Sequence, residues 1–268
     1  MTDPTFSGAV VLLGCGRLGS AILEGWLATD TVRPAELTIL TPSDKPASDL
    51  ARERGAKINP PAATLGTARA LVLAVKPAKW REALTPLLAD LPADLVIVSV
   101  MAGVKTADIA ALSQRPVARI MPTTAVSQAR GVAALWSSTP DAAAVGRALF
   151  TAIADVVEVE QETQMDAATA VAGSAPAFIY AFVEGLARAG EARGLSPEAA
   201  RRLASGALRS AGAGADTGAG LDALIARIAS PGGTTRAGLD AMEAGGDLDR
   251  ATEAAVNAAV NKAREISG

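Results

Sequence analysis

The sequence contains no histidine and one cysteine, Cys15, and both shortages restrict the chemistry available to the chain. Without histidine there is no serine–histidine triad, no histidine general base and no histidine-bound metal. A lone cysteine forms neither an intrachain disulfide nor a thiolate zinc cluster, so we expect no metal site. Any catalysis must use carboxylates, lysine, hydroxyl groups, backbone dipoles or a cofactor.

Aromatic residues are also few, and the net charge is small. Aromatics make up 3% of the 268 residues although hydrophobic residues make up 50%, because alanine supplies much of the apolar count. The net charge of −3 and the pI near 5.2 argue against a nucleic-acid binder, which usually has a basic face. No uninterrupted apolar run approaches the roughly 18 residues of a membrane span, and no basic segment precedes the first apolar stretch as in a secretory signal. We expect a cytoplasmic protein with neither nucleic acid nor a membrane as partner.

A glycine-rich turn follows the first apolar run. Ala9–Leu13 has the length of a strand, and Gly14, Gly16 and Gly19 lie between it and a helical pattern that continues to Leu27. Strand, G-x-G-x-x-G and helix in this order are typical of dinucleotide binding, since the glycines allow a tight turn, close approach to a pyrophosphate and close helix–strand packing. Cys15, inside the turn, is interpreted as a small filler and not a nucleophile.

A second strand, Glu36–Leu40, ends where the ribose of a dinucleotide would lie. An NAD site usually has an acidic residue there to bind the 2′-hydroxyl. Here Thr41, Ser43 and Lys45 follow the strand and suit a 2′-phosphate. We therefore predict NADP as cofactor, with NADPH preferred over NADH, while Asp44 leaves NAD open.

Four further apolar runs alternate with helical patterns, at Ala70–Val75, Leu95–Val100, Val117–Met121 and Gly131–Trp136. Continuous apolar strands separated by helices predict a Rossmann-type, doubly wound, mostly parallel sheet. Ligands of such sheets bind at the carboxyl ends of the strands. Those ends hold Ala74, Val75, Lys76, Pro77, Ala102, Gly103, Met121 and Pro122.

The second half of the chain has a helical pattern from about Glu162. We predict a dinucleotide-binding domain at 1–161 and an all-α domain at 162–268. A long helix, Gln164–Arg193, is expected to bend or break near Pro176, which lacks an N–H.

The turn Ser230–Thr235, of sequence SPGGTT, lies between helical patterns at Leu221–Ala229 and Arg236–Ala244. Its glycines allow a ligand to approach the backbone, and its hydroxyls stand beside a helix N-terminus that favours a carboxylate. Taken alone, the turn is more typical of an ordinary capped helix start than of a binding site.

Seven segments in order resemble pyrroline-5-carboxylate reductase, over nearly the whole chain. They are Gly14–Gly19, Ala74–Pro77, Ser99–Gly103, Arg119–Pro122, Asp166–Ala170, Gly173–Ala177 and Ser230–Thr235. The resemblance implies a Rossmann domain followed by a helical domain that forms an intertwined dimer, often assembled into a decamer. It also implies NAD(P)H-dependent reduction of a cyclic imine carboxylate to L-proline. In that reaction the imine arrives protonated and the cofactor supplies the hydride, so the protein mainly positions two planar reactants.

The resemblance, together with the strand ends and the helix start at SPGGTT, indicates roles for individual residues. Thr235 is expected to be catalytic, with its hydroxyl bonded to the ring nitrogen of the substrate. The helix-start amides of Gly232, Gly233 and Thr234 are expected to hold the substrate carboxylate, with Ser230 beside them and Ser174 in the wall of the cleft. The expected cofactor-binding residues are Gly14, Gly16, Arg17, Leu18, Gly19, Thr41, Ser43, Ala74, Val75, Lys76, Pro77, Ala102, Gly103, Met121 and Pro122.

Departures from the family pattern leave alternatives. Arg17 and Thr123 replace asparagines that are common in the family, and Ala175 replaces a glycine. A larger cyclic imine, such as piperideine carboxylate, is an alternative substrate, and a non-catalytic NADP-binding sensor is an alternative function. A β-hydroxyacid dehydrogenase is disfavoured, because its catalytic lysine has no counterpart in 173–184.

Overall fold

The computed structural model describes residues 6–267, which form two compact units. The first unit comprises the chain up to Gly173 together with the residues from Val260 onward, and the second is Ser174–Ala259. The helical second half of the chain begins at Glu162, where the sequence pattern changes. The two units divide later, at residue 173.

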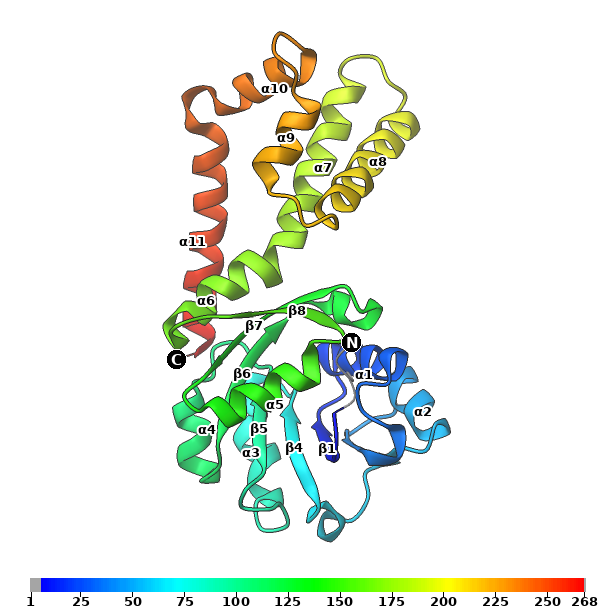
Figure 1. The fold of residues 1–268 in the computed structure, drawn as a ribbon, viewed down its shortest axis with the longest axis vertical. Helices are drawn as coiled ribbons and strands as arrows, with labels where there is room; N and C mark the ends of the chain where they lie inside the picture. Colours follow the sequence, from blue (N-terminus) through cyan, green and yellow to red (C-terminus); the bar gives the residue numbers. More distant parts are fainter. Residues whose placement is uncertain (1–5, 268) are drawn as a thin grey trace. The chain divides into compact units, whose positions relative to one another are not determined.

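The first unit contains one eight-stranded sheet within residues 6–267, with the strand order β3-β2-β1-β4-β5-β6-β7-β8 (Figure 1). The strands are β1 (Ala9–Leu13), β2 (Leu37–Leu40), β3 (Lys57–Ile58), β4 (Ala68–Leu73), β5 (Val96–Ser99), β6 (Val117–Pro122), β7 (Gly131–Ser137) and β8 (Ala154–Glu158). All neighbouring strands are parallel except β6 and β7. The predicted Rossmann-type, mostly parallel sheet is confirmed.

The structure adds two strands to the predicted ones and shows which strand departs from the parallel direction. Six strands lie where apolar runs predict them, but β3 and β8 have no such signal, since β3 is very short and β8 carries Asp155 and Glu158. β7 runs antiparallel to β6, with Ala118 opposite Ser137. The link 123–130 is shorter than the dozen or so residues that a parallel crossover needs, so the chain turns back.

Helices cover both faces of this sheet. They are α1 (Arg17–Thr29), α2 (Pro46–Glu53), α3 (Trp80–Leu84), α4 (Thr106–Ser113) and α5 (Pro140–Phe150), with short 3₁₀ helices η1 (Pro34–Glu36), η2 (Ala62–Leu65), η3 (Pro77–Lys79), η4 (Thr85–Leu87), η5 (Thr124–Gln128) and η6 (Glu162–Gln164). Side chains from α1, α2 and α5 bury Val10 and Leu12 on one face, and α3 and α4 bury Val11 and Leu13 on the other. This alternation gives β1 two apolar faces, as expected for a strand inside a doubly wound sheet.

From residue 165 the chain is helical. Its elements are α6 (Met165–Ala168), a π-helical turn η7 (Thr169–Ser174), α7 (Ala175–Glu191), α8 (Pro197–Ala215), α9 (Leu221–Ile228), α10 (Thr234–Glu243), η8 (Ala244–Gly246) and α11 (Asp247–Ser267). The helical segment continues from α6 through this π turn into α7, so the chain does not break before Pro176. π turns are among the features that bend helices. Ser196 caps α8 by accepting a hydrogen bond from the Ala199 amide at 3.3 Å.

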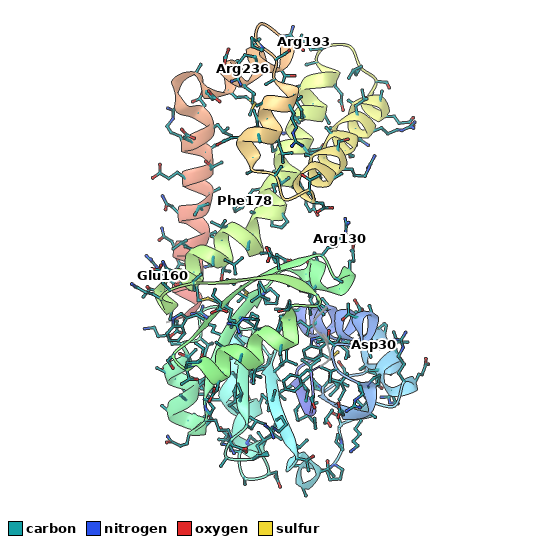
Figure 2. The ribbon with its side chains drawn as sticks, in the orientation of Figure 1. Asp30, Arg130, Glu160, Phe178, Arg193 and Arg236 are labelled. Atoms are coloured by element: carbon teal, nitrogen blue, oxygen red, sulfur yellow. The ribbon has the colours of Figure 1, made fainter. Side chains whose placement is uncertain are left out.

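The second unit exposes large apolar side chains over several helices. Those exposed are Phe178 (Figure 2), Ile179, Tyr180, Phe182, Leu186, Leu195, Leu203, Leu221, Ile225, Ile228 and Leu248. The continuous helical segment Glu162–Glu191 is long and apolar enough to span a bilayer by length and composition alone. A helix that buries an apolar face against a partner protein has the same properties.

Candidate functional site: a dinucleotide cavity

The three glycines of the first turn are required for different reasons. Gly14 has a φ of +103°, and a Cβ placed on it would lie 2.6 Å from the Ala74 carbonyl oxygen. A Cβ on Gly19 would overlap the Gly14 carbonyl oxygen, so this glycine lets α1 pack closely on the turn. A Cβ on Gly16 would meet no heavy atom within 4 Å among the described residues. Gly14 and Gly19 therefore serve the fold, while Gly16 leaves space for a ligand.

The glycine turn forms one side of a cavity of about 730 Å³ at the carboxyl ends of β1, β2 and β4. The Gly14 amide donates to the Leu40 carbonyl at 2.8 Å, and the Ala74 amide donates to the Leu13 carbonyl at 2.8 Å, so the three strand ends are tied together. Residues expected from the sequence line this cavity: Gly14, Gly16, Thr41, Ser43, Ala74, Val75 and Lys76. Lys45 and Cys15, both noted in the sequence, line it too. Four further lining residues had no sequence signal: Lys79, Glu82, Ala83 and Leu87.

The end of β2 is held by Asn59, a residue that sequence reasoning missed. Its side chain accepts from the Thr41 amide at 2.9 Å and donates to the Thr41 carbonyl at 2.8 Å. Thr41 in turn donates its hydroxyl to the Ser43 carbonyl at 3.0 Å. Asn59 has a φ of +46°, which asparagine tolerates better than most residues. These bonds fix the backbone that presents Ser43 and Lys45 to the cavity.

Asp44 is directed differently from its neighbours in sequence. Ser43 and Lys45 line the cavity, whereas Asp44 lies outside its lining and accepts from Arg52 on α2 at 3.0 Å. Arg52 also donates to Asp49 at 2.6 Å. Asp44, the acidic residue that keeps NAD as an alternative cofactor, is therefore paired with an arginine.

Cys15 is buried in the turn, as its interpretation as a filler requires. The residue is 2% exposed, and its sulfur lies 3.4 Å from the Ser20 hydroxyl. Burial raises the pKa of the thiol above its ordinary value of 9.0, against a smaller opposing effect of the Ser20 hydrogen bond. A protonated, buried thiol is a poor nucleophile.

Other residues of the expected cofactor set lie outside the lining of this cavity. Arg17 and Leu18 open α1, and Pro77 opens η3. Ala102, Gly103, Met121 and Pro122 follow or end β5 and β6. Met121 is buried, in contact with Ala134 and Met165.

A second cavity, of about 560 Å³, surrounds the buried Arg119 of β6. Its guanidinium lies 3.4 Å from Asp166 and 3.7 Å from Glu162, and its Nε has no partner among the described residues. Glu162 also accepts from the backbone amide of Thr106 at 2.8 Å and from its hydroxyl at 3.1 Å. Arg264 of α11 lies 4.0 Å from Asp166. All four charged residues belong to the first unit, so the cluster joins β6, η6, α6 and the end of α11 within that unit.

The SPGGTT turn lies wholly in the second unit, as does Ser174. α10 begins at Thr234, two residues before the predicted start, and Gly233 is its N-cap. The Gly233 amide donates to the Ser230 carbonyl at 3.0 Å, and Gly232 has a φ of +71°. Within the turn, the Gly233 amide is therefore already occupied, while Thr234 and Thr235 occupy the first positions of the helix, where amides lack intrahelical acceptors. Both threonines and Ser230 are exposed.

Two family models match this chain. Residues 162–266 match the model described as pyrroline-5-carboxylate reductase dimerisation. Residues 9–103, which contain the glycine turn and the strands around the dinucleotide cavity, match the model described as NADP oxidoreductase, coenzyme F420-dependent.

Individual proteins extend the similarity over nearly the whole chain. The chain is 30% identical to pyrroline-5-carboxylate reductase of Pseudomonas aeruginosa over 266 residues, which is 96% of each protein. It is 35% identical to the Thermus thermophilus enzyme of that name, over 76% of this chain and 78% of the relative. The structure of a pyrroline-5-carboxylate reductase from Coxiella burnetii is 26% identical, has a TM-score of 0.88 and covers 98% of this chain and 100% of that one. This chain belongs to the pyrroline-5-carboxylate reductase family.

Proposed function

We propose that this protein reduces 1-pyrroline-5-carboxylate to L-proline with NADPH, the last step of proline biosynthesis. The observation that carries the proposal is the cavity at the ends of β1, β2 and β4, in a chain of this family, with Ser43 and Lys45 at its β2 end. A chain without histidine suits this reaction, since the imine of the substrate is basic enough to arrive protonated.

The residues of the cavity fit a dinucleotide phosphate. Gly16 leaves open space at the N-terminus of α1, where backbone amides and the helix dipole favour a pyrophosphate. Ser43 and Lys45 suit the 2′-phosphate, while Ala74, Val75 and Lys76 border the cavity at the end of β4. NADPH, when bound, supplies the hydride. Gly14 and Thr41, which also line the cavity, complete the proposed cofactor-binding set together with Arg17, Leu18, Gly19, Pro77, Ala102, Gly103, Met121 and Pro122.

We assign the substrate carboxylate to the start of α10. The amides of Gly232, Thr234 and Thr235 are the proposed donors, because the Gly233 amide already donates to Ser230. The Thr235 hydroxyl is proposed to bond the ring nitrogen, and Ser230 and Ser174 to lie beside the substrate. Holding the charged carboxylate and the iminium in fixed positions lowers the entropic part of the barrier.

The helical region is proposed to bind a second copy of the chain. We assign residues 1–161 to dinucleotide binding and 162–268 to dimerisation and substrate binding. The exposed apolar side chains of α7 and α9 are chemically suited to a homodimer interface. Further assembly of dimers into a decamer, in the cytoplasm, is part of the same proposal.

The test is oxidation of NADPH, followed at the nicotinamide absorbance band, with 1-pyrroline-5-carboxylate as substrate and proline as the identified product. We expect turnover, with a lower kcat/KM for piperideine carboxylate. One methylene typically changes discrimination by about 1–3 kcal/mol, or roughly 5- to 150-fold. A higher kcat/KM for the larger ring would favour the alternative substrate. NADPH binding without turnover of either imine would favour a sensor.

A further inference from the structure

The loop after β2 carries three consecutive polar side chains, Ser43, Asp44 and Lys45, which separate into two groups. Ser43 and Lys45 line the dinucleotide cavity, while Asp44, between them in sequence, lies outside its lining. The Asp44 carboxylate accepts from Arg52 at 3.0 Å. A negative side chain at the end of this strand normally selects NAD, because it binds the ribose 2′-hydroxyl and repels a 2′-phosphate.

The position of Arg52 is fixed by its own helix. Arg52 donates to Asp49, one turn earlier on α2, at 2.6 Å. The start of α2 is fixed as well, because the Ser48 hydroxyl accepts from the Lys45 amide at 2.9 Å and donates to the Lys45 carbonyl at 2.8 Å. The guanidinium is therefore held beside the loop that presents Ser43 and Lys45.

We propose that Arg52 is a specificity-determining residue, which neutralises Asp44 and holds it outside the cavity, so that the loop accepts a 2′-phosphate. The inference rests on the NADPH preference proposed above and adds its physical origin in this chain. A phosphate monoester carries a charge of about −1.5 to −2 at neutral pH, so an unpaired carboxylate one residue from Ser43 and Lys45 opposes its binding. NADH lacks that phosphate and experiences almost none of this repulsion.

The effect is moderate, because the groups are in contact with solvent. The side chains of Arg52 and Asp44 are 49% and 73% exposed. Solvent and salt screen charges at such positions, so a change of roughly three- to tenfold in the dissociation constant is expected.

The experiment measures dissociation constants for NADPH and NADH by titration of cofactor fluorescence with the full chain, without imine substrate. Arg52→Gln is expected to raise the NADPH constant about three- to tenfold and the NADH constant less than twofold. Asp44→Asn in the Arg52→Gln background is expected to restore NADPH binding to within about twofold of wild type. The loss in Arg52→Gln is expected to shrink in high salt.

Arg33→Gln is the matched control. It breaks the Arg33–Glu36 pair of 2.7 Å, a surface ion pair away from the cavity, and makes the same charge change before β2 begins. Neither dissociation constant is expected to change with this control.

Three results would overturn the proposal: an unchanged NADPH constant in Arg52→Gln, an equal loss of NADPH and NADH, or a double variant no better than the single one. These binding measurements need no turnover, so they stay interpretable if the reductase assay fails. Wild-type NADPH binding no tighter than NADH binding would instead remove the cofactor preference on which the inference rests.

Discussion

Substitution of two glycines in the same turn separates the needs of the fold from those of the ligand. Gly14→Ala places a methyl group on a backbone with φ of +103°, 2.6 Å from the Ala74 carbonyl oxygen and 3.0 Å from a Val75 methyl group. The left-handed conformation costs a non-glycine residue about 1–3 kcal/mol, and overpacking against backbone costs about 1–3 kcal/mol more. We expect a total loss of roughly 2–6 kcal/mol, a large part of the 5–15 kcal/mol of a typical domain.

Gly16→Ala is the matched comparison. Its φ of −75° is ordinary for alanine, and no described heavy atom lies within 4 Å of the added methyl group. The free energy of unfolding is expected to fall by less than about 1 kcal/mol, from the weaker N-cap. The methyl group does occupy the space left for a pyrophosphate, so NADPH affinity is expected to fall by about tenfold or more.

Urea unfolding followed by tryptophan fluorescence measures the first part of this prediction. The three tryptophans, Trp26, Trp80 and Trp136, all lie in the first unit, so their signal reports that unit even if the two units unfold separately. Gly14→Ala is expected to lower the urea midpoint by roughly 1–2 M. Equal destabilisation by both substitutions, or tight NADPH binding by Gly16→Ala, would refute the assignment of separate roles.

Three further predictions concern other parts of the molecule. Thr235→Ala is expected to lower kcat/KM by roughly 30- to 1000-fold through loss of one oriented hydrogen bond, whereas Thr234→Ala, which keeps its backbone donor, is expected to change it far less. A wild-type kcat/KM in a folded Thr235 variant would contradict that role. Glu162→Ala removes a carboxylate from the buried Arg119 and is expected to cost about 3 kcal/mol in urea unfolding, and a cost below about 1 kcal/mol would mean that the ion pair is dispensable. Because the pKa of Cys15 is raised in the folded chain, its stabilising effect is present below the ordinary thiol value of 9.0 and is lost as the pH rises above it. The unfolding free energy of wild type should therefore fall more steeply with pH above 9.0 than that of Cys15→Ala, and parallel curves would argue against a raised pKa.

Local patterns predicted most of the sheet but not its edges. The run Ala9–Leu13 and the glycines behind it are local signals, and β1 and α1 form at these positions. β8 carries charges and is partly exposed, so its sequence has no continuous apolar run, and the tertiary pairing with β7 decides its structure. The prediction of a mostly parallel sheet did not say which strand is antiparallel, because apolar content alone does not reveal whether a link is long enough for a crossover.

The residues of the dinucleotide cavity could be predicted where they belong to a local motif. They could not be predicted where the contact joins side chains far apart in the sequence. Gly14, Gly16, Thr41 and Ser43 could be selected from strand ends. The contact of Asn59 with Thr41 joins residues 18 positions apart. The pairing of Asp44 with Arg52 likewise depends on the orientation of α2, which no pattern at the strand end reports.

The discontinuity of the first unit constrains how this protein is made in the cell. The segment from Val260 onward belongs to that unit, with Ala263 buried and Arg264 close to Asp166. Ribosomes add residues in order, at about 5–20 per second, and domains generally fold as their chains emerge. Here the sheet is synthesised early, but the unit stays incomplete for several seconds or more while the 86 residues of Ser174–Ala259 are translated. During that interval the surface around Asp166 lacks its final helix, which makes the nascent chain a candidate client for chaperones.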